Sequence, residues 1–201
     1  MPVDPFDQWF ANFLGQDALQ VETLLNDKTA IRFLIAWSLF ETSCFGGEAK
    51  VVGFKGLAID CVSNNEVQQS ELMDAANHFH ERYQDKIRYG NLMNKKPLCL
   101  DSIKWEEFKL HSEIRQKKFK LLSAEEIVFF VIFVVFRYRN NIFHGNKGVA
   151  SWLKYKDQIN QCIKVMQTLI TFKVEALHKA AEQGDAEAQE TIKKLNIDRN
   201  E

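Results

Sequence analysis

The feature that most constrains the fold is an uninterrupted apolar run, "IVFFVIFVVF", at residues 127–136. A helix that crosses a membrane needs about 20 apolar residues, so this run is too short and indicates a segment buried in a protein core. The 201-residue chain is long enough to fold as one domain with a substantial core. It contains only 3 Pro and 9 Gly, which disfavours a turn-rich sandwich or barrel and favours helices.

The residues in front of the run predict that it begins a helix rather than a strand. Ser123 and Glu126 form a capping-box pattern, and Leu122 and Ile127 occupy the two hydrophobic-staple positions. The many Val, Ile and Phe residues favour a strand, but we give the capping signals and the length of the segment more weight. About 20 residues from Ser123 form a helix about 30 Å long. Because this helix is apolar all round at its start, we expect it at the centre of a bundle, ended by "GNKG" at 145–148.

Apolar residues recur at helical spacing over most of the remaining chain. This spacing predicts helices at residues 6–25 with an interruption at Gly15, at 28–44 up to Gly46 and Gly47, from a cap at Asn64 or Asn65 to about Tyr89, at 101–120, and at 151–183 up to Gly184. The glycines and short β-branched runs near residues 45–63 predict an irregular loop, with a strand or a short helix as alternatives. We therefore predict an all-α fold. It is a four- to five-helix up-down bundle over residues 1–183, followed by a polar C-terminal tail or short helix at 184–201.

Charge is distributed unevenly along the chain. Residues 81–156 hold 16 Lys and Arg against 8 Asp and Glu, whereas residues 1–80 hold 4 against 11. Clustered positive charge can attract nucleic acid by releasing counterions. An equally supported interpretation is that these charges pair with the acidic third of this chain or of a second copy.

The cysteines and the N-terminus indicate the cellular compartment. Cys44, Cys61, Cys99 and Cys162 lie far apart and show no metal-ligand spacing, so we expect free, buried thiols. The start "MPVDPFDQWF" lacks the basic residues and apolar stretch of a signal peptide. We therefore expect a cytoplasmic protein with no membrane segment.

Immediately after the apolar run comes a polar stretch, and "FRYRNNIFHG" occupies residues 136–145. An arginine such as Arg139 can hold a phosphodiester with two parallel hydrogen bonds, an imidazole such as His144 can exchange a proton near neutral pH, and Asn140 can orient either group. On a regular helix Arg139 and His144 are about 140° apart. Either the helix loosens near His144, or each residue serves a different face, or a two-fold dimer brings two such helix ends together. No carboxylate cluster accompanies His144, so we predict neither a metal site nor a cofactor.

The stretch "RNNIFHG" after a hydrophobic helix resembles the HEPN superfamily. These small all-helical domains are marked by an Arg, a polar residue that is often Asn, and a His after four to six positions. The segment "LIAWSLFET" at 34–42 is also similar to an earlier core helix of several HEPN groups. The resemblance implies a four- or five-helix bundle that forms a homodimer with its motifs opposed and cleaves RNA without a metal. Such proteins often act as toxins or in phage defence, with an antitoxin or sensor as partner.

The resemblance also implies roles for the motif residues. His144 would help to activate the ribose 2′-hydroxyl or protonate the leaving oxygen, Arg139 would hold and neutralise the scissile phosphate, and Asn140 would orient them. The product would be a 2′,3′-cyclic phosphate. One alternative is a non-catalytic HEPN module that binds RNA, a nucleotide or a partner protein, and another is a purely structural bundle in which the polar stretch only holds a dimer together.

Further candidates surround the motif. Arg137 lies seven residues before His144 and returns to nearly the same helix face, but we prefer Arg139 because an Asn follows it directly. We predict that Arg137, Asn141 and Lys147 contact the substrate.

Other polar residues have simpler explanations. Glu41 can pair with one of the arginines across the bundle, although a solvated or capping glutamate is the stronger interpretation. His111 and His178 are expected at the surface. His78 and His80 lie two residues apart on a predicted helix and point in different directions, which argues against a shared metal.

Overall fold

The structure is a computed structural model and describes residues 4–15, 18–63, 70–93, 105–143 and 154–195. These residues form helices, turns and short connections, and they contain no strand. The predicted all-α fold is confirmed. Within the same residues, no helix is both long enough and apolar enough to cross a bilayer.

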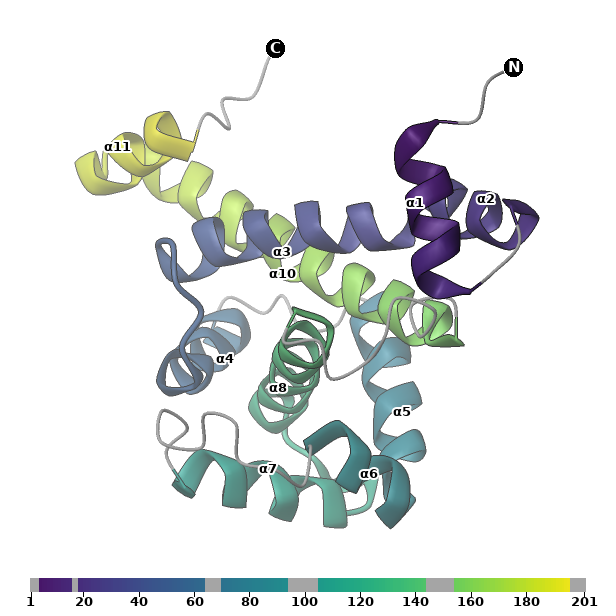
Figure 1. The fold of residues 1–201 in the computed structure, drawn as a ribbon. Coiled ribbons are helices and arrows are strands. Elements are labelled where there is room, and N and C mark those ends of the chain that lie inside the picture. Colours follow the sequence, from purple (N-terminus) through teal and green to yellow (C-terminus); the bar gives the residue numbers. More distant parts are fainter. Residues whose placement is uncertain (1–3, 16–17, 64–69, 94–104, 144–153, 196–201) are drawn as a thin grey trace.

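The described chain divides into more and shorter helices than the four or five that were predicted (Figure 1). The helices are α1 (Pro5–Leu14), α2 (Ala18–Asn26), α3 (Thr29–Phe45), α4 (Phe54–Ser63), α5 (Ser70–Gln84), α6 (Lys86–Met93), α7 (Trp105–Gln116), α8 (Ala124–Phe143), α10 (Lys156–Glu182) and α11 (Ala186–Leu195), with 3₁₀ turns η1 (Val51–Gly53) and η3 (Phe119–Leu121).

Helix α8 carries the apolar run and lies at the centre of the molecule (Figure 1). It packs against α4, α5, α6, α7 and α10, and every residue from Ile127 to Val135 is buried. Phe133 contacts rings on two of these neighbours, Phe54 of α4 at 6.4 Å and Phe108 of α7 at 6.3 Å between ring centroids. A helix enclosed on all sides can be apolar all round, which explains why its sequence shows no polar face.

The predicted capping box begins α8. Glu126 N–H donates to Ser123 Oγ at 3.2 Å, and Ser123 N–H donates to Glu126 Oε2 at 3.0 Å. Two N–H groups at the helix start are thereby satisfied. Leu122 and Ile127, at the staple positions, both pack in the main apolar core. The local signals outweighed the strand preference of the following residues.

The segment at 45–63 is helical rather than irregular. Gly46 adopts the left-handed conformation, with φ 69°, and ends α3 as predicted. The chain then passes through η1 into α4, which realises the short-helix alternative. Helix α4 buries Phe54, Leu57, Ala58 and Cys61 and packs against α8. These four positions have helical spacing, and their burial outweighs the local effect of the glycines.

The helix predicted to reach Tyr89 is broken at Asp85. The Asp85 carboxylate accepts from the N–H groups of Ile87 at 2.8 Å and Arg88 at 3.0 Å, so it caps the start of α6. The predicted caps, Asn64 and Asn65, lie outside the described residues.

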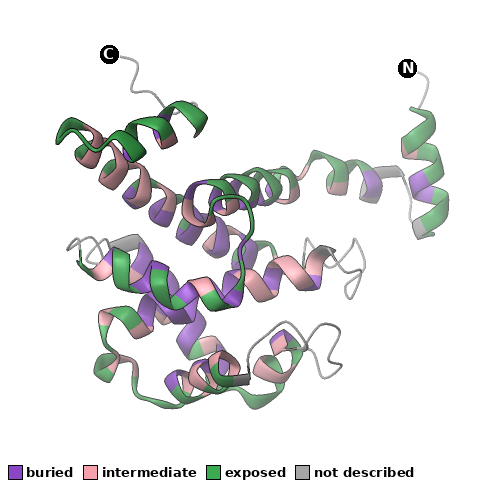
Figure 2. Ribbon diagram, turned by 90° about the vertical axis from the view of Figure 1, so that its left-hand side faces the viewer, coloured by how far each residue is buried: buried purple, intermediate pink, exposed green. Residues whose placement is uncertain are grey.

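The last long helix ends where the sequence indicated, at Glu182, and Gly184 follows with φ 90°. The polar C-terminal segment then forms α11, which packs on α10 with Ala188 and Ile192 buried. At the other end of the chain, α1 and α2 share a small apolar cluster that is separate from the main core. Figure 2 shows both terminal regions as largely exposed.

The described cysteines are free thiols, as predicted. Burial raises the pKa of Cys44 to about 12 and that of Cys162 well above its usual value, so both are protonated at neutral pH. Cys99 lies outside the described residues.

Candidate functional site

Four of the predicted site residues lie on the last two turns of α8. These are Arg137, Arg139, Asn140 and Asn141. His144 and Lys147 lie within 144–153, outside the described residues. The structure therefore places the arginines and asparagines of the motif.

Arg139 and Asn140 form a pair. Arg139 Nη1 donates to Asn140 Oδ1 at 3.1 Å, and both side chains are half-buried. The Arg139 guanidinium carbon also lies 5.5 Å from the ring centroid of Trp37 on α3, within the range of a cation–π contact. Trp37 is buried and contacts Phe136 of α8 at 6.4 Å. The planar guanidinium thus lies against a buried aromatic ring, with its Nε buried and the side chain as a whole half-buried.

Arg137 and Asn141 face a different neighbour. Arg137 donates from Nη2 to Met93 O at 2.9 Å and from Nε to Leu92 O at 3.4 Å. Asn141, which is only 3% exposed, donates from Nδ2 to the same Leu92 oxygen at 3.0 Å. These oxygens are at the C-terminus of α6, where carbonyl groups lack partners within the helix and a positive charge is favourable. The two side chains therefore fasten α6 to α8.

The geometry separates the two candidate arginines. Residues 137 and 141 are four apart and share a face of α8, whereas residue 139 is rotated by about 200° from residue 137. Arg137 is engaged in a structural contact, and Arg139 lies on the side of α3. The predicted substrate contacts of Arg137 and Asn141 remain predictions. To make them, both side chains would have to bind a ligand while they also bind the carbonyl oxygens of α6.

Glu41 has a capping role. Its Oε1 accepts from Ala49 N–H at 3.3 Å, and its backbone oxygen accepts from Gly47 N–H at 3.0 Å. The carboxylate thereby fixes the turn that follows α3. This contact agrees with the capping interpretation of Glu41.

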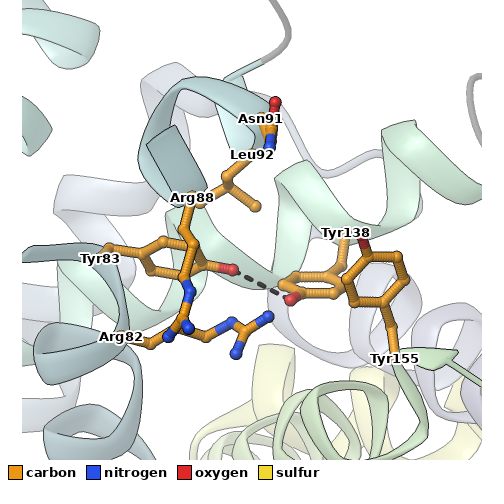
Figure 3. Close-up of a pocket in the computed structure, with 7 residues that line it drawn as sticks. All are labelled: Arg82, Tyr83, Arg88, Asn91, Leu92, Tyr138 and Tyr155. Atoms are coloured by element: carbon orange, nitrogen blue, oxygen red, sulfur yellow. Dashed lines mark hydrogen bonds between the residues drawn. The ribbon is translucent and has the colours of Figure 1, made fainter. Parts of the chain in front are cut away.

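A small, open pocket with an enclosed volume of about 40 Å³ lies on the other side of α8 (Figure 3). Its lining comes from α5, α6, α8 and the start of α10, and consists of Arg82, Tyr83, Arg88, Asn91, Leu92, Tyr138 and Tyr155. Sequence reasoning missed this site. An available signal was the repeated Arg-Tyr dipeptide at 82–83, 88–89 and 137–138, in which each arginine adjoins an aromatic residue.

Two buried phenols form the floor of the pocket. Tyr83 Oη donates to Tyr138 Oη at 2.9 Å. Burial raises the pKa of both tyrosines, so both hydroxyls keep their protons at neutral pH. The Tyr138 ring is buried in the core.

The prediction that His111 lies at the surface is wrong. His111 is fully buried and stacks against Phe130 and Phe133, with ring centroids at 4.7 Å and 4.4 Å. Its Nδ1 is 3.1 Å from Tyr89 Oη. Burial lowers the pKa of His111 to about 3, so the ring is neutral and acts as a core aromatic.

Some of the basic residues in 81–156 also have structural partners. Arg115 donates to Tyr83 O at 2.9 Å and lies over the Tyr89 ring, and Lys117 pairs with Glu126. Lys156 pairs with Asp27 at 2.6 Å, linking the basic and acidic thirds of the chain. Among the residues that the structure describes, no group of three or more His, Cys, Asp or Glu side chains is arranged to hold a metal ion.

Comparisons with protein-family models, with curated proteins and with solved structures find no match to this chain.

Proposed function

We propose that this protein is a metal-independent endoribonuclease of the HEPN type, which cleaves RNA by attack of the ribose 2′-hydroxyl and leaves a 2′,3′-cyclic phosphate. The observation that carries the proposal is the Arg139–Asn140 pair at the end of the central helix, five residues before His144 in sequence. The proposal rests on the sequence resemblance and on the position of this half-buried pair at the end of α8.

In the proposed mechanism the arginine binds the scissile phosphate. The Trp37 ring holds the Arg139 guanidinium in place, and Asn140 fixes its orientation through the 3.1 Å hydrogen bond. A prepositioned cation stabilises the negative charge that develops on the phosphate without further reorganisation. His144 exchanges a proton with the 2′-hydroxyl or the leaving oxygen. The nucleophile belongs to RNA itself, so the reaction calls for neither a metal nor an activated side chain.

We propose that the active form is a homodimer with two such motifs opposed. The support is a stripe of exposed apolar side chains on α3, the helix that also carries Trp37. It contains Ile31 and Ile35, each 56% exposed, and Leu39, 51% exposed. Apolar side chains on one helix face are typical of the buried centre of an interface.

The test is cleavage of single-stranded RNA in EDTA by the wild type, His144→Ala and Arg139→Ala. Loss of a positioned proton donor or acceptor lowers rates by about 10²–10⁴-fold, and loss of a charge-stabilising donor by about 10²–10³-fold. We expect losses in these ranges and a cyclic-phosphate terminus in the wild-type product. His178→Ala is the matched control, since this half-buried histidine lies near the far end of α10. Equal cleavage by the wild type and both motif variants would end the proposal.

A cytoplasmic toxin or anti-phage effector, restrained by an antitoxin or sensor protein, is the cellular role that fits such an activity. Expression would then arrest growth, and His144→Ala would relieve the arrest.

The second candidate is a non-catalytic HEPN module that binds RNA, a nucleotide or a partner protein. It is favoured by the structural contacts of Arg137 and Asn141, which commit part of the polar stretch to holding α6. RNA binding that survives His144→Ala, together with no cleavage by the wild type, would select this candidate.

A further inference from the structure

The pocket beside α8 combines positive charge, hydrogen-bond donors and aromatic walls. Figure 3 shows the Arg82 and Arg88 side chains converging next to the hydrogen bond between Tyr83 and Tyr138, with Asn91 at the rim. The pocket is small, with an enclosed volume of about 40 Å³, which suits a compact group rather than a whole drug-sized molecule.

The described residues balance the charges of the pocket only in part: the Asp85 carboxylate lies near both arginines, and the Arg82 side chain contacts the Tyr138 hydroxyl. Within the described residues, Arg88 forms a weak ion pair, Nε to Asp85 Oδ2 at 3.8 Å, between side chains that are about half exposed. The Asp85 carboxylate also accepts two backbone N–H groups at the start of α6. Arg82 Nε is buried and has no hydrogen-bond partner among the described residues. Two guanidinium groups that converge repel each other, and an anion between them would remove that repulsion and satisfy the Arg82 donor.

We propose that this pocket binds a phosphate group through Arg82 and Arg88. Guanidinium groups match the oxygen spacing of phosphate and bind it with two parallel hydrogen bonds. The half-buried Tyr155 lines the opposite wall and offers an aromatic surface to the group that carries the phosphate. The phosphate belongs either to a small phosphomonoester or to the backbone of a nucleic-acid strand, since both present the same oxyanion.

The pocket is joined to the motif through α6. Leu92 lines the pocket, and its carbonyl oxygen accepts from Arg137 and Asn141 of α8. Tyr138, between the two arginines in sequence, forms part of the floor. The site is nevertheless distinct from the Arg139–Asn140 pair, which faces α3. It can bind phosphate whether or not the chain cleaves RNA.

Two probes separate the possible sources of the phosphate. Titration calorimetry in about 0.15 M salt uses adenosine 5′-monophosphate as the phosphomonoester and a short single-stranded DNA without a terminal phosphate as the strand. DNA lacks the 2′-hydroxyl, so the proposed cleavage cannot consume it. Tighter binding of the monophosphate would show that the pocket takes the phosphate of a small phosphomonoester. Tighter binding of the DNA would show that it takes the phosphate of a nucleic-acid backbone. Binding of neither probe overturns the proposal.

The variants are Arg88→Gln, Arg82→Gln and the double change. Loss of a charge-assisted hydrogen bond weakens binding by about 10-fold or more, so we expect that loss from each single variant and a greater loss from the double variant. Arg88 is exposed, so its substitution leaves the core intact, and circular dichroism checks the fold of all three. The matched control is Arg32→Gln, an exposed arginine on α3. Unchanged binding by the double variant, or an equal loss in Arg32→Gln, contradicts the proposal.

His78 provides a second readout that requires no loss of binding. It lies four residues before Arg82 on α5, and its pKa is lowered by burial and by the charge of Arg82, while Asp157 and Glu81 raise it. Phosphate bound at Arg82 adds negative charge nearby, so the pKa of His78 should increase on addition of the ligand, as followed by NMR. The same titration in Arg82→Gln should show a smaller increase. An unchanged His78 pKa at saturating ligand would place the bound phosphate elsewhere.

Discussion

The two motif arginines differ in their contacts, so their replacement should separate stability from activity. Arg137→Met keeps most of the side-chain stem but removes the donors that bind the C-terminus of α6. One of these contacts, to Met93 O at 2.9 Å, is well formed, and the other, to Leu92 O at 3.4 Å, is near the limit of a hydrogen bond. A hydrogen bond from a charged donor contributes about 1.5–3 kcal/mol. Asn141 still donates to Leu92 O, so we expect the loss of one full contact, about 2 kcal/mol of the free energy of unfolding.

Arg139→Met should cost less stability. Arg139 donates to its neighbour Asn140, which lies on the same half-exposed surface, and its contact with Trp37 is 5.5 Å from the ring centroid. A cation–π contact at a partly exposed site contributes about 0.5–1 kcal/mol. From the cation–π contact we expect a loss of about 1 kcal/mol, together with the loss of RNA cleavage described above.

The assay is urea unfolding of the wild type and both variants, followed by circular dichroism at one pH and salt concentration. For a domain of this size, a loss of about 2 kcal/mol corresponds to a decrease in Tm of roughly 4–8 °C. Asn141→Ala removes one neutral hydrogen bond to Leu92 O. Its loss of free energy of unfolding should lie between those of the two arginine variants or close to that of Arg139→Met. A destabilisation by Arg139→Met that equals or exceeds that of Arg137→Met would refute the assignment of structural and accessible roles.

The remaining predictions concern pH and assembly. The unfolded His111 titrates near pH 6.5 and the folded one near pH 3, so the unfolded chain binds the extra proton between these values. Stability should therefore fall as the pH decreases, by about 2 kcal/mol between pH 7 and pH 5. His111→Phe, which keeps a ring against Phe130 and Phe133, should flatten this dependence in urea unfolding, and an unchanged slope would show that other groups cause it. Ile35→Glu, on the exposed stripe of α3, should convert the proposed dimer to monomer in analytical ultracentrifugation. A dimer of undiminished stability would exclude the stripe from the interface.

Local sequence signals were sufficient for the central helix. Ser123 and Glu126 form the predicted capping box, and the run at 127–136 is too short to cross a membrane and too apolar for a surface helix. Local sequence signals gave the wrong prediction near residues 45–63, where the glycines indicated a loop. There the burial of Phe54 and Leu57 against α8 decided in favour of a helix. Local propensity is small compared with the free energy of burying large apolar side chains.

The sequence alone could not identify the hydrogen-bond partners of the polar residues. Its spacing established that Arg137 and Arg139 point in different directions, but Asn141 and Arg137 bind carbonyl groups about 45 residues earlier in the chain. Likewise, the sequence did not distinguish His111 from a surface histidine. Only the tertiary structure shows that its ring packs against Phe130 and Phe133. The sequence by itself determined the helical class, the buried central helix and the polar stretch at its end, because these depend on contacts within a few residues. The tertiary structure decided which arginine fastens α6 and which remains accessible, and it formed the pocket of Arg82 and Arg88, because these depend on how distant helices pack.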